Sequence, residues 1–167
     1  MLVASMNPCP CGYYGSSTHE CSCTPAQIAK YLARLSGPLM DRIDLHISVD
    51  NVTYDDLSSD TLAESSESVR NRVNAARRIQ LERFSGTDVY SNSKMNALMI
   101  REYCKLDDES EKLLRLAFDK LKLSARAYSR ILKVARTIAD LEGSRDISSK
   151  HLSEALTYRS MDRDYLI

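Results

Sequence analysis

The amino-acid sequence predicts a mainly α-helical fold, in which a short mixed segment with two strands, a cysteine-rich loop and one helix precedes a helical bundle. From about residue 94 to the C-terminus, apolar residues recur at helical spacing between short polar joints. Two apolar runs in the first 50 residues have the length of strands instead. Four of the five cysteines lie within fifteen residues that show no periodicity, which indicates a loop.

The first strand is predicted over residues 2–6, and it ends at Asn7-Pro8. Residues 8–24 follow as a loop rich in Cys, Gly, Ser, Pro and Tyr. An apolar strand with no turn before it is an unusual start for a domain. We therefore expect a preceding part of the parent protein.

A helix is predicted to begin at Thr24-Pro25, because a capping hydroxyl followed by proline is typical of a first helical turn. Its apolar face consists of Ile28, Leu32 and Leu35. Ser36-Gly37-Pro38 ends it, and a short turn then leads into the second predicted strand, residues 43–49. Apolar and polar residues alternate along that run, which indicates a half-buried strand.

Residues 50–63 are predicted to be a polar connector, followed by a long helix over about 64–84 and a loop over 85–93. One face of the helix carries the apolar positions Val69, Val73, Ala76 and Ile79 or Gln80. The rest is dominated by the arginines Arg70, Arg72, Arg77, Arg78 and Arg83. Such arginines bind nucleic-acid phosphates in some proteins. In others they pack their stems on neighbours and leave their charges in water, and both interpretations stay open.

Four further helices are predicted over about 94–103, 108–121, 124–142 and 148–158. Asn92-Ser93 is expected to cap the first, and Gly143 to end the third, because glycine is common just past a helix C-terminus. Short joints between antiparallel helices predict a small bundle. The predicted division is 1–50 for the mixed segment, 51–93 for the connector and basic helix, and 94–167 for the bundle.

The composition is that of an ordinary globular chain, with 43% hydrophobic and 28% charged residues among 167. Acids and bases balance at 23 each, so the chain as a whole is no polycation. No apolar run approaches the roughly 20 residues that span a bilayer, and no secretory signal pattern begins the chain. We expect a cytoplasmic protein in a reduced compartment, because a secreted disulfide scaffold would spread its cysteines more widely.

The cysteine loop is a candidate metal site. Cys9-x-Cys11 and Cys21-x-Cys23 are separated by nine residues, with His19 nearby. Four thiolates suit a tetrahedral zinc ion, and a loop with so few apolar residues has little else to order it. Free, oxidisable thiols and paired disulfides are the alternatives.

Two arginine-bearing segments are candidate phosphate sites, because a guanidinium group binds oxyanions with a planar pair of donors. Arg42 stands at the entry of the second predicted strand, in Gly37–His46. Arg126, Arg130 and Lys133 share one side of the helix after Ser124, and residues 121–139 contain no acid. Cations without acidic partners favour a phosphate ligand. The alternatives are a solvated surface for the helix and, for Arg42, an ion pair with Asp41 or Asp44.

Three stretches resemble one family closely and in the same order: MNPCPCGY at 6–13, GPLMDRIDLH at 37–46 and SARAYSRILKVARTIADLEG at 124–143. The sequence is similar to AAA+ ATPases, and more narrowly to the magnesium chelatase-related group that includes the competence protein ComM (YifB) family. The resemblance covers essentially the whole chain. It implies the end of an α/β AAA+ core followed by a helical AAA+ lid domain.

The resemblance also implies residue roles. Asn7 matches the sensor 1 position that orients the attacking water, for which a strand-end turn residue is the alternative. Arg42 matches the arginine finger that reaches the ATP of a neighbouring subunit. Arg126 matches the sensor 2 arginine of the lid, and Arg130 is a second candidate nucleotide contact on the same helix. His46 and His151 receive no catalytic role.

The family implies ATP, Mg²⁺, a hexameric ring and ATP-driven DNA remodelling of the branch-migration helicase type. No G-x-x-x-x-G-K-[ST] loop occurs in this chain, so we expect it not to hydrolyse ATP by itself. Two alternatives stay open, a magnesium chelatase motor subunit and a non-enzymatic zinc-bearing module that binds nucleic acid. The cysteine loop, which looks like a ComM-type feature, argues against the motor subunit.

Overall fold

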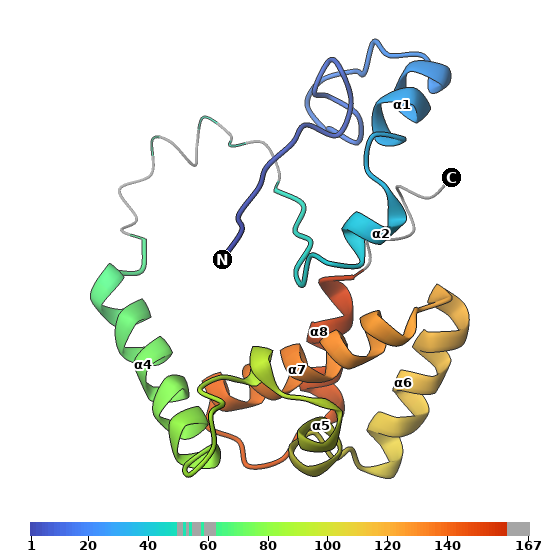
Figure 1. Ribbon diagram of the computed structural model, residues 1–167. Coiled ribbons are helices and arrows are strands. Elements are labelled where there is room, and N and C mark those ends of the chain that lie inside the picture. Colours follow the sequence, from blue (N-terminus) through green and yellow to red (C-terminus); the bar gives the residue numbers. More distant parts are fainter. Residues whose placement is uncertain (50–51, 53, 55–57, 59–62, 160–167) are drawn as a thin grey trace.

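The computed structural model describes residues 1–49, 52, 54, 58 and 63–159 (Figure 1). Within these residues the chain is mainly helical, which confirms the predicted fold class. The elements in chain order are α1 (Pro25–Leu32), α2 (Gly37–Met40), α4 (Ser66–Arg83), the 3₁₀ turn η1 (Asn92–Lys94), α5 (Ala97–Tyr103), α6 (Asp108–Leu121), α7 (Ala125–Glu142) and α8 (Ser149–Thr157). Residues 66–159 are called the bundle below.

Local capping chemistry sets the helix ends. Thr24 and Gln27 form a reciprocal capping box before α1, with Pro25 in the first turn. The Ser124 hydroxyl accepts from the Ala127 amide to begin α7. Gly143 ends the same helix at φ 72°, a left-handed conformation that suits glycine. The predicted boundaries of these helices are therefore confirmed to within a few residues.

One predicted cap is wrong. Asn96, and not Asn92-Ser93, caps α5 by accepting from the Met99 amide at 3.0 Å. Asn92 is only 1% exposed, and its side chain donates to Asp140 instead. A buried polar partner contributed by a distant helix outweighs the local capping preference of this residue.

Neither predicted strand forms. In the described part of the chain the one β-bridge joins Leu106 to Ile147, and residues 2–6 and 43–49 have no ladder partner. Side chains expected to be buried there are exposed, including Val3 at 81% and Ile47 at 62%. A strand needs a neighbour to accept its backbone hydrogen bonds, and the alternation of residue types alone does not supply one.

The core of the bundle surrounds α7. This helix packs against α4, η1, α5 and α8, and α8 also packs against α6 (Figure 1). Ala127, Ala135 and Ala139 on α7 are at most 1% exposed, and their small side chains let the neighbouring helices approach closely. The apolar core runs from Phe84 to Ala155. Burial of such side chains contributes about 25 cal/mol per Å², so this cluster is the main stabilising feature of the fold.

A buried polar network fastens α4 to α7. Asp140 is 1% exposed and accepts hydrogen bonds from Arg83, Arg136 and Asn92. Of the five arginines on the polar side of this helix, Arg83 therefore binds a buried partner on α7. The apolar face of that helix is covered only toward its C-terminus, where Ala76 and Gln80 are buried while Val73 is 45% exposed.

Most of the predicted connector, residues 50–63, lies outside the described residues. The long helix begins at Ser66 with Ser65 as its cap, two residues after the predicted start. No helix in the described residues combines the length and the apolar character required to cross a bilayer.

Candidate functional site

Arg42 lies at the end of a small, locally capped turn. The Ser36 hydroxyl accepts from the Leu39 amide at 3.3 Å and begins α2. Pro38 suits the first turn of this helix, because its missing N–H would have no partner there. Arg42 is exposed, and its Nη1 donates back to the Pro38 carbonyl at 3.0 Å. Residues 36–46, which include this turn, are called the Arg42 segment.

Neither neighbouring carboxylate pairs with Arg42. Asp41 accepts a hydrogen bond from the Ser124 hydroxyl at 3.0 Å. Asp44 forms an ion pair with Arg130. The alternative in which Arg42 is an ordinary ion-pair partner of Asp41 or Asp44 is therefore not found within the described residues.

The bundle holds the backbone of the Arg42 segment directly. Arg130 Nη1 donates to the Arg42 carbonyl at 2.6 Å, and Arg159 Nη1 donates to the Ile43 carbonyl at 2.7 Å and to that of Met40 at 3.3 Å. The His46 amide donates to the Tyr158 carbonyl at 2.9 Å. Sequence reasoning missed Arg159, which lies just beyond α8 and is 1% exposed. No local pattern marks an arginine that binds carbonyls more than a hundred residues away.

Arg126 is exposed in the first turn of α7, directly after the Ser124 cap. No hydrogen bond or ion pair links it to another described residue. The Ser124–Asp41 hydrogen bond places the start of this helix beside the Arg42 segment, so Arg42 and Arg126 each lie within two residues, along the chain, of this contact.

The other two cations of α7 have partners. Arg130 pairs with Asp44, and Lys133 Nζ donates to the Ser93 carbonyl at 3.0 Å. Partial burial, and then the nearby Arg130 charge, lower the pKa of Lys133. The lack of acids within residues 121–139 therefore does not leave these two cations without partners, because the partners, Asp44 and the Ser93 carbonyl, lie elsewhere in the chain.

Asn7 lies apart from these arginines, against the cysteine loop. It is exposed, and a Cβ atom placed on Gly12 would lie 3.7 Å from its Nδ2. Gly12 has φ +86° and its amide donates to the Cys9 carbonyl at 3.0 Å. No hydrogen bond or ion pair in the described residues joins Asn7 to Arg42 or Arg126.

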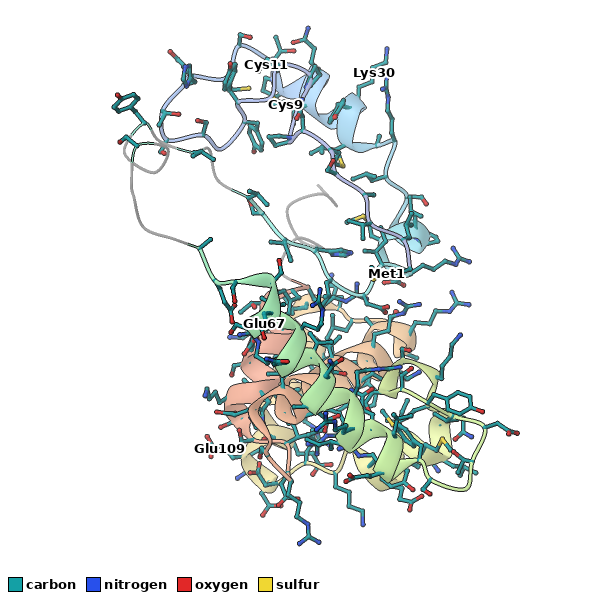
Figure 2. All side chains as sticks on the ribbon, turned by 90° about the vertical axis from the view of Figure 1, so that its left-hand side faces the viewer. Met1, Cys9, Cys11, Lys30, Glu67 and Glu109 are labelled. Carbon is teal, nitrogen blue, oxygen red and sulfur yellow. The ribbon has the colours of Figure 1, made fainter. Side chains whose placement is uncertain are left out.

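The four loop cysteines form one cluster, at the end of the molecule opposite Glu109 of α6 (Figure 2). Their sulfur atoms all lie within 4.8 Å of one another. Cys9 Sγ is 3.3 Å from Cys11 Sγ and 3.7 Å from Cys21 Sγ, and Cys11 Sγ is 3.5 Å from Cys21 Sγ. Four thiolates around a tetrahedral zinc, each about 2.3 Å from it, lie about 3.8 Å apart. The donor set therefore fits a zinc-like ion.

The electrostatics of the cluster also favour a cation. The Tyr13 backbone amide, followed by neighbouring sulfurs, lowers the pKa of Cys11 to about 5. The Cys23 amide acts to lower the pKa of Cys21. Burial and the Cys11 and Cys9 sulfurs have the opposite and larger effect, and they raise this pKa to about 12. One thiolate thus forms readily and opposes ionisation of its neighbour. A bound divalent cation removes that conflict, because coordination deprotonates thiols outright.

The structure also bears on the alternative of paired disulfides and on the two residues outside the cluster, His19 and Cys104. All five cysteines are free thiols in this structure, and none is in a disulfide. His19 is not in the cluster, and its ring stacks on that of Tyr13 with centroids 4.8 Å apart. Cys104 is a buried core residue, and burial raises the pKa of its thiol to about 11, which makes it a poor nucleophile.

Comparison with known proteins extends these observations. Residues 63–159 match the family described as magnesium chelatase, subunit ChlI C-terminal, and residues 1–57 match magnesium chelatase, subunit ChlI. The chain belongs to this magnesium chelatase-related family. Its similarity to the competence protein ComM of Haemophilus influenzae places it in the ComM/YifB group, with 48% identity over 163 residues.

Other relatives agree with this grouping. The protein YifB of Escherichia coli is 43% identical over 167 residues, and YifB of Salmonella typhimurium is 41% identical over 163. Each of these three matches covers 97% of this chain but only 31% of the relative. The chain thus spans about a third of the length of these relatives. Membership of the family makes it an AAA+-type protein.

Proposed function

We propose that this chain supplies the arginine finger, the sensor 2 arginine and the sensor 1 asparagine of an ATP-driven AAA+ machine that remodels DNA. One observation supports this most strongly. Arg42 and Arg126, distant in sequence, are both exposed and both belong to a contact in which Ser124 bonds to Asp41. Two guanidinium groups held on one unit, with their charged ends available, suit a site where phosphate negative charge must be stabilised.

In this proposal each residue has one role. Arg42 reaches the γ-phosphate of ATP bound by a neighbouring subunit, and Arg126 contacts that of its own subunit. Asn7 orients the attacking water. Mg²⁺ bridges the phosphates and neutralises developing charge. Arg130 is a second candidate for contact with the nucleotide.

The rest of the machine lies outside this chain. The chain lacks the phosphate-binding loop, so ATP would be held by another part of a longer protein, as expected from relatives about three times as long. In that protein residues 1–50 would complete the ATPase core, 51–93 would connect, and 94–167 would form the lid. A hexameric ring would bring the finger of one subunit to the ATP of the next.

DNA is the proposed substrate, and two observations support it. One relative carries the name competence protein. In addition, Arg70, Arg77 and Arg78 on α4 are exposed, and none has a recorded ion-pair partner among the described residues. Arginines of this kind suit contacts with a phosphate backbone.

The proposal predicts the effect of Arg42→Ala in the full-length protein. The ATPase rate should fall by about 10³–10⁵, because a finger stabilises the transferring phosphoryl group. ATP binding should stay nearly unchanged, since the finger acts on the neighbour's nucleotide. Arg115→Ala, which removes an exposed cation from α6, is the matched control for ATP turnover and equilibrium binding. An Arg42→Ala protein with a normal rate excludes the finger role.

Mixing two inactive variants tests action between subunits. In a ring of Arg42→Ala and Arg126→Ala subunits, some interfaces combine an intact Arg126 with an intact finger from the neighbour. ATPase activity should therefore reappear on mixing. If the mixture stays as inactive as its components, Arg42 and Arg126 do not act on nucleotides at a shared interface.

We also propose that the loop cysteines bind one zinc ion through Cys9, Cys11, Cys21 and Cys23. Zinc would staple a loop that contributes no residue other than Cys9 to the buried apolar set. The same four thiols support a non-enzymatic nucleic-acid-binding module as the second candidate function. That function requires the chain to bind DNA in a chelator-sensitive way that Arg42→Ala does not alter.

A further inference from the structure

Arg42 lies in a local turn, in which its amide donates to the Leu39 carbonyl and its side chain to the Pro38 carbonyl, and the bundle then holds this turn in place. The backbone after α2 is in no strand and accepts no ladder hydrogen bond among the described residues. Three consecutive contacts replace that support, from Ser124 to Asp41, from Arg130 to the Arg42 carbonyl, and from Arg159 to the Ile43 carbonyl.

These contacts are buried or involve charged donors, which makes them strong. Arg159 is 1% exposed and inserts a guanidinium group between the Met40 and Ile43 carbonyls. Arg130 also forms an ion pair with Asp44, so it binds the Arg42 carbonyl before Ile43 and the Asp44 carboxylate after it. Hydrogen bonds from charged donors are roughly twice as strong as neutral ones. The Arg42 segment and the bundle should therefore move as one rigid body.

Arg130 also lies one helical turn after Arg126 on α7. The residue proposed to touch the subunit's own ATP and the residue that holds the finger backbone are thus on the same rigid helix. A displacement of α7 caused by nucleotide at Arg126 would carry the Arg42 carbonyl with it.

We infer that Arg130 and Arg159 are positioning residues that lock the finger-bearing turn to the bundle, so that nucleotide sensed at Arg126 in one subunit changes the finger offered to the next. The coupling rests on the proposed function, whereas the lock itself does not. Arg130 then acts through Arg42 instead of touching ATP, which differs from its predicted role as a nucleotide contact.

Steady-state kinetics of the full-length protein distinguish the two roles of Arg130. A positioning residue should lower kcat by about 10- to 100-fold when changed to Gln, because small misplacements of a catalytic group are costly, while the KM for ATP stays within about twofold. Arg130→Lys should recover part of the loss, since the ammonium group still pairs with Asp44. Arg115→Gln is the matched control. A raised KM with unchanged kcat would show a nucleotide ligand and overturn the inference.

Hydrogen exchange tests the lock without any reference to catalysis. In Arg130→Gln, amides in residues 41–46 should exchange at least about tenfold faster, including the His46 amide that donates to Tyr158. Asp44→Asn removes the ion pair but keeps the carbonyl contact, so its effect should be smaller. Arg159→Gln risks misfolding because the side chain is buried, and Arg130 is therefore the decisive position.

The two proposals fail separately. Unchanged exchange in Arg130→Gln overturns the lock, whatever Arg42→Ala does to ATP turnover. Faster exchange in Arg130→Gln combined with normal turnover in Arg42→Ala overturns the finger role and leaves the lock standing.

Discussion

Asp140 shows how a single residue organises the interior. Its carboxylate is buried and is shared by Arg83 of α4, Arg136 of its own helix and Asn92 of η1. Arg136 also donates to the Ser144 and Arg145 carbonyls, so each of its three guanidinium nitrogens makes a hydrogen bond. Buried charges are tolerated only when they are paired and hydrogen-bonded in this manner.

Changing Asp140 to Asn should destabilise the bundle by about 3–5 kcal/mol, because it leaves the buried Arg136 and the partly buried Arg83 without a counter-charge. Chemical denaturation followed by circular dichroism measures the loss. Asp119→Asn on the exposed face of α6 is the control and should change stability by less than about 0.5 kcal/mol. A similar small effect for Asp140→Asn would contradict the role assigned to the network.

At the scale of elements, the helices follow local chemistry closely and the expected strands do not. The helices α6 and α7 combine apolar residues at helical spacing with Asp107 and Ser124 as caps. All of that information lies within the element. Residues 43–49 carry an equally regular alternation, yet a strand forms only with a partner, and here the backbone of His46 binds Tyr158 after α8 instead.

The end of α7 gives a prediction at this scale. Gly143→Ala should destabilise the bundle by roughly 1–2 kcal/mol, because a Cβ is disfavoured in the left-handed conformation. No atom within 4 Å would meet the added methyl group, so the cost is one of backbone conformation. Gly143→Asn should cost less, since asparagine tolerates this region better. Thermal unfolding of the three proteins gives the ranking, and equal losses for Ala and Asn would refute this explanation.

The whole molecule consists of a bundle with its own apolar core and an N-terminal part outside that core. The core cluster begins at Phe84 and includes no residue of the first 49. The cysteine cluster lies far from it (Figure 2). The order of residues 8–24 should therefore depend on metal, whereas the stability of the bundle should not.

Metal removal tests this separation. The purified protein should contain about one zinc per chain, and chelation should speed hydrogen exchange in residues 8–24 while leaving the thermal transition of the helices in place. Cys11→Ser should lose the metal, whereas Cys104→Ser should keep it because Cys104 lies outside the cluster. Zinc retained by Cys11→Ser, or helices that melt on chelation, would contradict the prediction.

The helices, most of their caps and the grouping of the four cysteines in one loop follow from the sequence, because each depends on residues that are close together along the chain. Its match to the family also named Arg42 and Arg126. The folded chain was needed to show that the strands lack partners, that Arg83 binds the buried Asp140, and that Arg130 and Arg159 hold the Arg42 segment. These depend on contacts between residues 57 to 119 positions apart, for which local periodicity and capping carry no signal.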